Sequence, residues 1–156
     1  MKINIVTVGN LKEKYLVEAC KEYLKRLSRY HTVNVIEIDE EKLPKNYSEA
    51  DISKALVKEG SRISKYLLGY VIILDLKGQQ LDSVEFSKAI EKISLSSDTI
   101  TFVIGGSYGM SNEIKSRANM SICFSKMTFP HQLFRVMLLE QIYRATAISN
   151  NVLYHK

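Results

Sequence analysis

The sequence predicts a single α/β domain, residues 1–156, with a mostly parallel sheet of about five strands and helices on both faces. Short runs rich in Val, Ile and Thr alternate along the chain with longer segments whose apolar residues recur at helical spacing. Strands that alternate with helices favour a parallel sheet that is covered on both faces. The length corresponds to one domain that is large enough to bury its own core.

The first half of the chain contains two strand-helix units. Ile3–Val8 is a strand-like run that stops at a Gly-Asn pair, and residues 11–30 follow with helical periodicity. Residues 32–39 again resemble a strand. Residues 39–48 contain a proline and an asparagine and predict a loop, after which residues 49–68 predict a helix.

The second half predicts three more strands, separated by shorter helices. The strands are residues 70–75, 99–104 and 120–125, and the helices are residues 83–93, 111–119 and 130–149. Pro130 suits the first turn of the last helix, where a missing N–H costs little. Thr128, just before it, is placed to cap that helix.

Composition and charge narrow the class of protein and of partner. Hydrophobic residues make up 46% and charged residues 25% of the chain, which is typical of a globular protein. The formal net charge is +5, which favours a polyanionic partner such as RNA or an acidic membrane surface. The basic segment 11–30 is either a solvated helix face or a footprint for phosphates.

Cysteine and histidine usage predicts neither disulfides nor a metal site. Cys20 and Cys123 are far apart in sequence and lack metal-ligand spacing, so we expect reduced packing residues and a cytoplasmic location. Three histidines are spread along the chain, which leaves no metal-ligand pattern. We also expect no secretory signal and no membrane span, since no apolar run approaches about 20 residues.

Three loops follow predicted strands and carry the informative residues: Leu74–Gln79, Ile104–Gly109 and Phe124–His131. Ligands of open parallel sheets bind beyond the carboxyl ends of the strands, so these loops predict one crevice. Gly105-Gly106 lacks the spacing of a dinucleotide or phosphate loop. It is either a tight turn or a place where a ligand reaches the main chain.

The third loop suits a neutral heterocycle such as adenine better than a phosphate. Its turn, Ser125–Pro130, combines main-chain donors with apolar side chains. By composition alone, however, Met127 and Phe129 are core residues more often than ligand contacts.

Polar pairs mark the last helix and the segment after it. His131 and Arg135 share a helix face, and Glu140 and Arg144 repeat this spacing. Either pair can be an ordinary helix-surface feature, and the final Tyr154-His155-Lys156 can be a frayed tail. Alternatively, these groups bind a nucleotide, with the aromatic ring stacked on its base.

Taken together, the motifs resemble those of the RlmH family, SPOUT-class methyltransferases of large-subunit ribosomal RNA. The resemblance covers essentially the whole chain. The motifs that carry it are Leu74-Asp-Leu-Lys-Gly78, Phe102-Val-Ile-Gly-Gly-Ser-Tyr-Gly109, Ser125-Lys-Met-Thr-Phe-Pro-His131, Arg135, Glu140-Gln-Ile-Tyr-Arg-Ala145 and Tyr154-His155.

The resemblance implies an activity, a fold and an assembly. A methyl group would pass from S-adenosylmethionine to N3 of a pseudouridine in the helix 69 loop of bacterial 23S rRNA, within an assembled ribosome. The chain would form one SPOUT-type α/β knot with a C-terminal trefoil knot. It would act as a homodimer whose sites draw on both subunits, without a metal or a membrane.

The resemblance also assigns residues. The positions that match the family's cofactor site are Leu74, Gly105, Phe124, Ser125, Lys126, Met127, Thr128 and Phe129. The positions expected near the RNA are His131, Arg135, Arg144, Tyr154 and His155. The chain departs from the family at Asn150–Leu153, where a small residue or proline is frequent.

The chemistry of methylation suggests roles for these polar residues. The N3 proton must leave, and we hypothesise that His155, or His131 through a water, accepts it. Arg135 or Arg144 would steady the negative charge that develops on the base.

Two other functions are weighed against the methyltransferase hypothesis. The same basic domain could be a non-catalytic RNA- or ribosome-binding module. A nucleotide-dependent oxidoreductase is weakened by the lack of a dinucleotide fingerprint after any strand.

Overall fold

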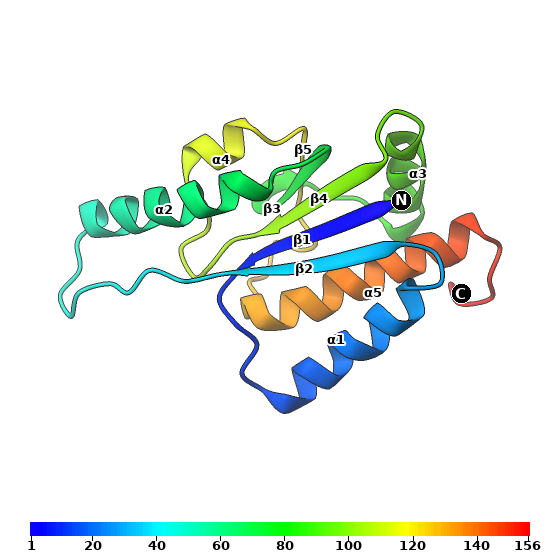
Figure 1. Ribbon diagram of the computed structural model, residues 1–156, viewed down its shortest axis with the longest axis horizontal. Helices are drawn as coiled ribbons and strands as arrows, with labels where there is room; N and C mark the ends of the chain where they lie inside the picture. The colour runs from blue at the N-terminus through cyan, green and yellow to red at the C-terminus, as the bar shows by residue number, and fades with distance from the viewer.

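The computed structural model describes residues 1–156 and contains one five-stranded sheet with helices on both faces (Figure 1). The strands are β1 (Lys2–Val8), β2 (Thr32–Ile38), β3 (Tyr70–Gln79), β4 (Thr99–Ile104) and β5 (Met120–Ile122). They lie in the order β2-β1-β4-β3-β5, and every neighbouring pair is parallel. The predicted fold class is therefore confirmed.

The helices divide between the two faces of the sheet. They are α1 (Lys14–Leu27), α2 (Glu49–Ile63), η1 (Ser64–Tyr66), α3 (Ser83–Ser94), α4 (Asn112–Ser116) and α5 (His131–Ser149). Helix α5 packs between α1 and α3 on one face, and α2 packs with α4 on the other (Figure 1). None of them combines the length and apolar content needed to cross a bilayer.

Each face of the sheet has its own hydrophobic core. Ile5, Phe102 and Leu138 belong to the larger core beneath α1, α3 and α5. Val6 and Val103 belong to the smaller core beneath α2 and α4. Strand β4 is buried along its whole length, as expected for a central strand of a parallel sheet that is covered on both faces.

Local sequence sets the starts of α2 and α3. Ser48 and Asp82 occupy the N-cap positions, and each forms a capping box with the acidic residue three positions later. The last helix is different. Pro130 occupies its N-cap position without any side-chain cap, so the prediction that Thr128 caps this helix is wrong. The proline's fixed φ and the burial of α5 against the sheet set this start without a cap.

Strand boundaries near the carboxyl edge of the sheet differ from the prediction. Strand β3 continues to Gln79, with a shift in register after Leu74, whereas β5 ends at Ile122. A Cβ on Gly78 would lie 2.6 Å from the Ile122 carbonyl carbon, so only glycine lets the two backbones approach here. The segment predicted as a free loop is therefore partly a strand that holds β5.

Two predicted helices are shorter than expected. Helix α2 gives way after Ile63 to the 3-10 turn η1, before the chain turns at Gly69 with a φ of 65°. Helix α4 has only 5 residues. Gly69 could not carry a side chain, since a Cβ would lie 2.2 Å from the Thr99 carbonyl oxygen, and this tight approach fixes where the connection to β3 begins.

His31 is a half-buried histidine that links the start of β2 to α5. Its Nε2 lies 2.9 Å from Thr146 Oγ1, and Thr146 donates its own proton to the Ile142 carbonyl oxygen at 2.8 Å. Nε2 must therefore carry the proton in this contact. Nδ1 is then buried, with neither a proton nor a partner. Burial and the nearby N-terminal ammonium lower the pKa of His31.

This lowered pKa predicts a loss of stability in mild acid. The unfolded chain takes up the His31 proton more readily, so the free energy of unfolding should fall as the pH drops through the unfolded value of about 6.5. Replacing His31 with Gln should reduce this fall between about pH 7 and 5. Urea unfolding of the wild type and of the His31→Gln variant at several pH values measures this free energy. The same dependence on pH in both proteins would contradict the lowered pKa of His31.

Candidate functional site

The three strand-end loops line one cavity of about 570 Å³ at the carboxyl edge of the sheet. Its walls are Leu74–Lys77 from β3, Ile104–Met110 after β4, and most of Ile122–His131 after β5, with Phe134 from α5. The convergence that the topology predicts is thus present. Its volume lies within the usual range for small-molecule sites.

Most of the residues assigned to a cofactor face this cavity. Those that line it are Leu74, Gly105, Phe124, Ser125, Met127, Thr128 and Phe129. Lys126, in the middle of the same turn, is exposed and does not line it. Phe134 joins the set from α5, with ring centroids 5.2 Å from Phe124 and 6.0 Å from Phe129. One end of the cavity is therefore aromatic.

The turn after β5 is held by its own polar atoms. The Met127 N–H donates to Ser125 Oγ at 3.0 Å, and the Cys123 thiol lies 3.0 Å from the Ser125 carbonyl oxygen. Met127 is 72% exposed, which corrects the composition-based reading of this residue as core. An exposed methionine at the rim of a cavity can pack on a ligand.

The glycines after β4 form a tight turn. The Gly109 N–H donates to the Gly106 carbonyl oxygen at 3.0 Å, and Gly109 has a φ of 82°. A Cβ on Gly105 would lie 2.5 Å from the Gly109 carbonyl oxygen, whereas one on Gly109 would meet open space. Gly105 therefore allows the turn to close, and Gly109 leaves main chain open beside the cavity.

An ion pair in the cavity wall was not predicted from the sequence. Lys115 Nζ of α4 lies 2.8 Å from Asp75 Oδ2, and the Lys77 N–H donates to Asp75 Oδ1 at 3.1 Å. Burial of the Asp75 carboxyl raises its pKa, but these two hydrogen bonds outweigh it and leave the pKa below the usual value. Asp75 is the last residue of a predicted strand, which was a usable signal, whereas Lys115 gave none.

Arg135 is buried and ties α5 to the ends of β1 and β2. Its guanidinium contacts Glu37 Oε2 at 3.0 Å and donates to the Gly9 carbonyl oxygen, also at 3.0 Å. Only 4% of its side chain is exposed, and its Nε has no partner. His131, one turn earlier, lines the cavity, and its Nε2 would lie 3.5 Å from a Cβ on Gly9. Arg135 thus fixes the backbone against which His131 rests.

The remaining predicted residues gather around Glu140. Its Oε1 accepts from Arg144 Nε at 3.0 Å and from the Tyr154 hydroxyl at 3.0 Å. Arg144 lies over the Tyr154 ring and donates to His155 Nδ1 at 3.2 Å. Burial and the bond to Glu140 help raise the pKa of Tyr154. Residues 154 and 155 are therefore not a frayed tail, and Glu140–Arg144 is more than an exposed pair.

Within one chain, this Glu140 cluster and the cavity belong to different parts of α5. His131 stands at the first turn, and Arg144 lies about 20 Å further along the helix axis. The C-terminus lies beside the end of α5, away from the start of that helix (Figure 1). Neither Tyr154 nor His155 lines the 570 Å³ cavity of its own chain.

Two other cavities adjoin the site. One of about 530 Å³ lies between α3 and α5, includes Glu140, and shares Ile122, Cys123 and Phe124 with the 570 Å³ cavity. The other, of about 690 Å³, lies beside the loop after β2 and is lined mainly by polar residues. It is larger, but the 570 Å³ cavity alone combines all three strand-end loops with an aromatic wall, which makes it the candidate site. No cluster that could hold a metal ion is present.

Comparison with known proteins places the chain in a family. The family described as "Predicted SPOUT methyltransferase" matches residues 1–155. A protein of Clostridium kluyveri named ribosomal RNA large subunit methyltransferase H is 54% identical over 159 aligned residues, with both chains fully covered. A Clostridium tetani protein of the same name is 53% identical, also at full coverage. The chain belongs to the RlmH family of SPOUT methyltransferases.

Solved structures with little sequence identity agree on the fold. A probable methylase family protein from Haemophilus influenzae has a TM-score of 0.60 at 14% identity, and the match covers 99% of this chain and 70% of that one. A probable methyltransferase from Bordetella pertussis has a TM-score of 0.56 at 12% identity, and the match covers 92% of this chain and 95% of that one. Proteins with only 12–14% sequence identity to this chain therefore share its fold.

The Glu140 cluster predicts how the last residues respond to mutation. Replacing Glu140 with Gln removes the charge that holds Arg144 and Tyr154, and hydrogen bonds to charged groups contribute about 1.5–3 kcal/mol. Amide hydrogen exchange in residues 150–156 should become at least about tenfold faster, whereas exchange in the sheet should not change. Glu91 to Gln, on the exposed surface of α3, is the control. Unchanged exchange in the tail would contradict the role of Glu140.

Proposed function

We propose that this protein methylates N3 of a pseudouridine in the helix 69 loop of bacterial 23S rRNA within the assembled ribosome, using S-adenosylmethionine (SAM). The convergence of three loops on one aromatic-lined cavity, in a chain of the RlmH family, carries the proposal. The names of the clostridial relatives support large-subunit ribosomal RNA as the substrate. The particular nucleotide rests on the family resemblance, and the proposal includes a cytoplasmic location.

The cavity fits SAM in size and in chemistry. Phe124, Phe129 and Leu74 would hold the adenine ring, since flat heterocycles pack well between aromatic and aliphatic walls. Asp75 and Lys115 offer the two opposite charges that match the ammonium and carboxylate of the methionine part. When bound, SAM supplies a methyl group on a positively charged sulfur, ready for in-line displacement.

The protein's own task is to align the acceptor nitrogen and to remove its proton. Alignment alone can supply roughly 7–11 kcal/mol of the rate acceleration. We assign the N3 proton to His155, with His131 acting through a water as the second candidate. Arg144 has only donors, so the His155 Nδ1 that it contacts is unprotonated, and its lone pair would be free to accept a proton once Arg144 releases it. The Arg144 guanidinium would then stabilise the negative charge that develops on the pseudouridine base.

Arg135 takes a different role in this proposal. Its guanidinium is enclosed by Glu37 and Gly9, which favours positioning of His131 over contact with the base. Tyr154 would stack on the RNA beside His155, since single-stranded bases are commonly held on aromatic rings.

The site would be completed by a second copy of the chain. Tyr154 and His155 contact Glu140 and Arg144, and Arg144 lies about 20 Å along α5 from His131 at the cavity, which favours delivery of the tail to the cavity of a partner. Exposed apolar side chains at both ends of α5 support such a pairing: Met127 and Leu133 at one end, Val152 and Leu153 at the other. A homodimer with two-fold symmetry would pair these ends twice.

The proposal keeps the C-terminal trefoil knot that the resemblance implies. Strand β5 lies at the edge of the sheet, yet α5 returns to pack between α1 and α3 beneath its middle. This return, past the close contact of Gly78 with Ile122, supports threading of the last segment.

Transfer to ribosomes tests the function directly. Purified protein and radiolabelled SAM should place label on one helix 69 pseudouridine of ribosomes from cells that lack this enzyme. Phe129→Ala should weaken SAM binding about tenfold or more, because stacking on one aromatic ring is worth about 1–3 kcal/mol. Leu95→Ala, at an exposed site on the end of α3, is the control.

Either failure is informative. SAM binding with no transfer to any rRNA would refute the proposed acceptor. Binding to ribosomes with no affinity for SAM would instead favour a non-catalytic RNA-binding module.

Mixing of two inactive variants tests the shared site. Gly105→Ala disturbs the cavity, and Tyr154→Ala with His155→Ala removes the tail groups. Equal mixing should give about half heterodimers, each with one intact composite site, so activity should return to about one quarter of wild type. Size-exclusion chromatography should show that both variants remain dimeric. No recovery on mixing would mean that each chain completes its own site.

A further inference from the structure

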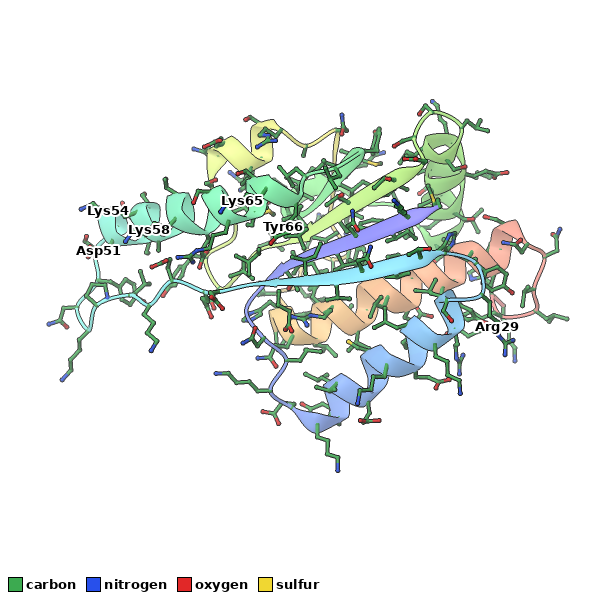
Figure 2. All side chains as sticks on the ribbon, in the orientation of Figure 1. Arg29, Asp51, Lys54, Lys58, Lys65 and Tyr66 are labelled. Carbon is green, nitrogen blue, oxygen red and sulfur yellow. The ribbon has the colours of Figure 1, made fainter.

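Helix α2 carries a stripe of three exposed lysines. Lys54, Lys58 and Lys65 are spaced by four and seven residues, which places them on one side of the helix and of the turn η1 that follows. Figure 2 shows all three along this element, and they span about 17 Å of helix axis. We name Lys54, Lys58 and Lys65 the α2 stripe.

None of the three lysines of the α2 stripe forms an ion pair, although the charge of Lys54 helps the bonds from Ser48 to lower the pKa of Asp51. The acidic residues of α2 are directed elsewhere. Glu49 and Asp51 lie in the first turn, where Asp51 completes the capping box with Ser48. Glu59 is buried and accepts from the Glu41 N–H at 2.9 Å. The charge of the stripe is therefore available to a partner.

The other basic helix differs in this respect. On α1, Lys21 pairs with Glu18 and Arg26 pairs with Glu22. The Arg26 guanidinium also lies over the ring of Tyr143 on α5, at 5.6 Å from its centroid. The basic residues of α1 are thus partly used within the chain, so α2 is the better candidate for a phosphate contact.

Exposed aromatic and apolar groups adjoin the stripe. Tyr66, directly after Lys65, is 39% exposed, and Leu68 is 58% exposed. Cations next to an exposed ring are typical of surfaces that bind single-stranded nucleic acid, where lysines contact phosphates and rings stack on bases.

The position of α2 makes this surface compatible with the candidate site. Helix α2 follows β2, so its first half, with Lys54 and Lys58, lies toward the carboxyl edge of the sheet, where the 570 Å³ cavity opens (Figures 1 and 2). It lies on the opposite face from α1, α3 and α5. A dimer that packs through α5 would leave the α2 stripe free.

We propose that the α2 stripe binds the phosphate backbone of an RNA segment that flanks the methylated nucleotide, with Tyr66 stacking on one of its bases. This inference rests on the proposed function. It gives the small domain a second contact with the RNA, which fixes the orientation of the substrate without reading its sequence.

Co-sedimentation with bacterial 70S ribosomes at several salt concentrations tests the stripe independently of methyl transfer. The variant is Lys54→Gln with Lys58→Gln. The matched control is Lys88→Gln with Lys92→Gln, which are also exposed, four residues apart and on a helix, α3. Both double variants lose two positive charges and should keep the wild-type affinity for SAM.

The α2 variant should bind ribosomes about tenfold more weakly, and the slope of log K against log salt should fall by about 1.5. KM for ribosomes should rise while kcat stays unchanged, and the α3 control should behave as wild type. Equal losses in the two variants, or none in either, would overturn the proposal. If ribosome binding depends on the α2 stripe but no rRNA is methylated, the result supports RNA binding by the stripe and refutes the proposed function.

Discussion

Parallel pairing of all five strands is the constraint on which the site depends. It makes every strand end at the same edge of the sheet, so loops that are far apart in sequence meet there. The edge position of β5 matters most, because this three-residue strand brings the turn Phe124–Phe129 against Leu74 and the Gly105 turn. The approach of Gly78 to Ile122 allows this pairing. The aromatic wall of the cavity is thus a consequence of strand order.

A buried guanidinium links this edge to the last helix. Arg135 joins α5 to the ends of β1 and β2, and His131 at the cavity rests on the same Gly9 backbone. The Arg135 guanidinium is buried although Glu37 is partly exposed, so removing Glu37 would leave a buried positive charge without its carboxylate, which is destabilising. Helix α5 therefore holds its first turn at the cavity of its own chain while it carries Arg144 and His155 away from it. This geometry supports the proposed dimer, in which a second chain would bring the two ends together.

Much of this was accessible from the sequence because the periodicities are strong. The alternation of Ile3–Val8 and the run Thr99–Ile104 predicted strands, and the alternation of strands with helices along the chain predicted the parallel sheet. What could not be predicted depends on tertiary contacts. Lys115 meets Asp75 across 40 positions of sequence, and the extension of β3 to Gln79 exists only because β5 lies beside it. The cap assigned to Thr128 failed because Pro130 and the packing of α5 start that helix. Composition alone favoured a core position for Met127, because hydrophobicity does not reveal which apolar side chains a turn leaves outside.

The choice among the three cavities is the central claim, and amide chemical shifts on titration with SAM test it most directly. The largest changes should fall in Leu74–Lys77, Gly105–Met110 and Cys123–Phe129, the three segments that line the 570 Å³ cavity. Changes confined to the polar cavity beside the loop after β2, around Glu40, Tyr47 and Glu59, would place the cofactor elsewhere and contradict the assignment.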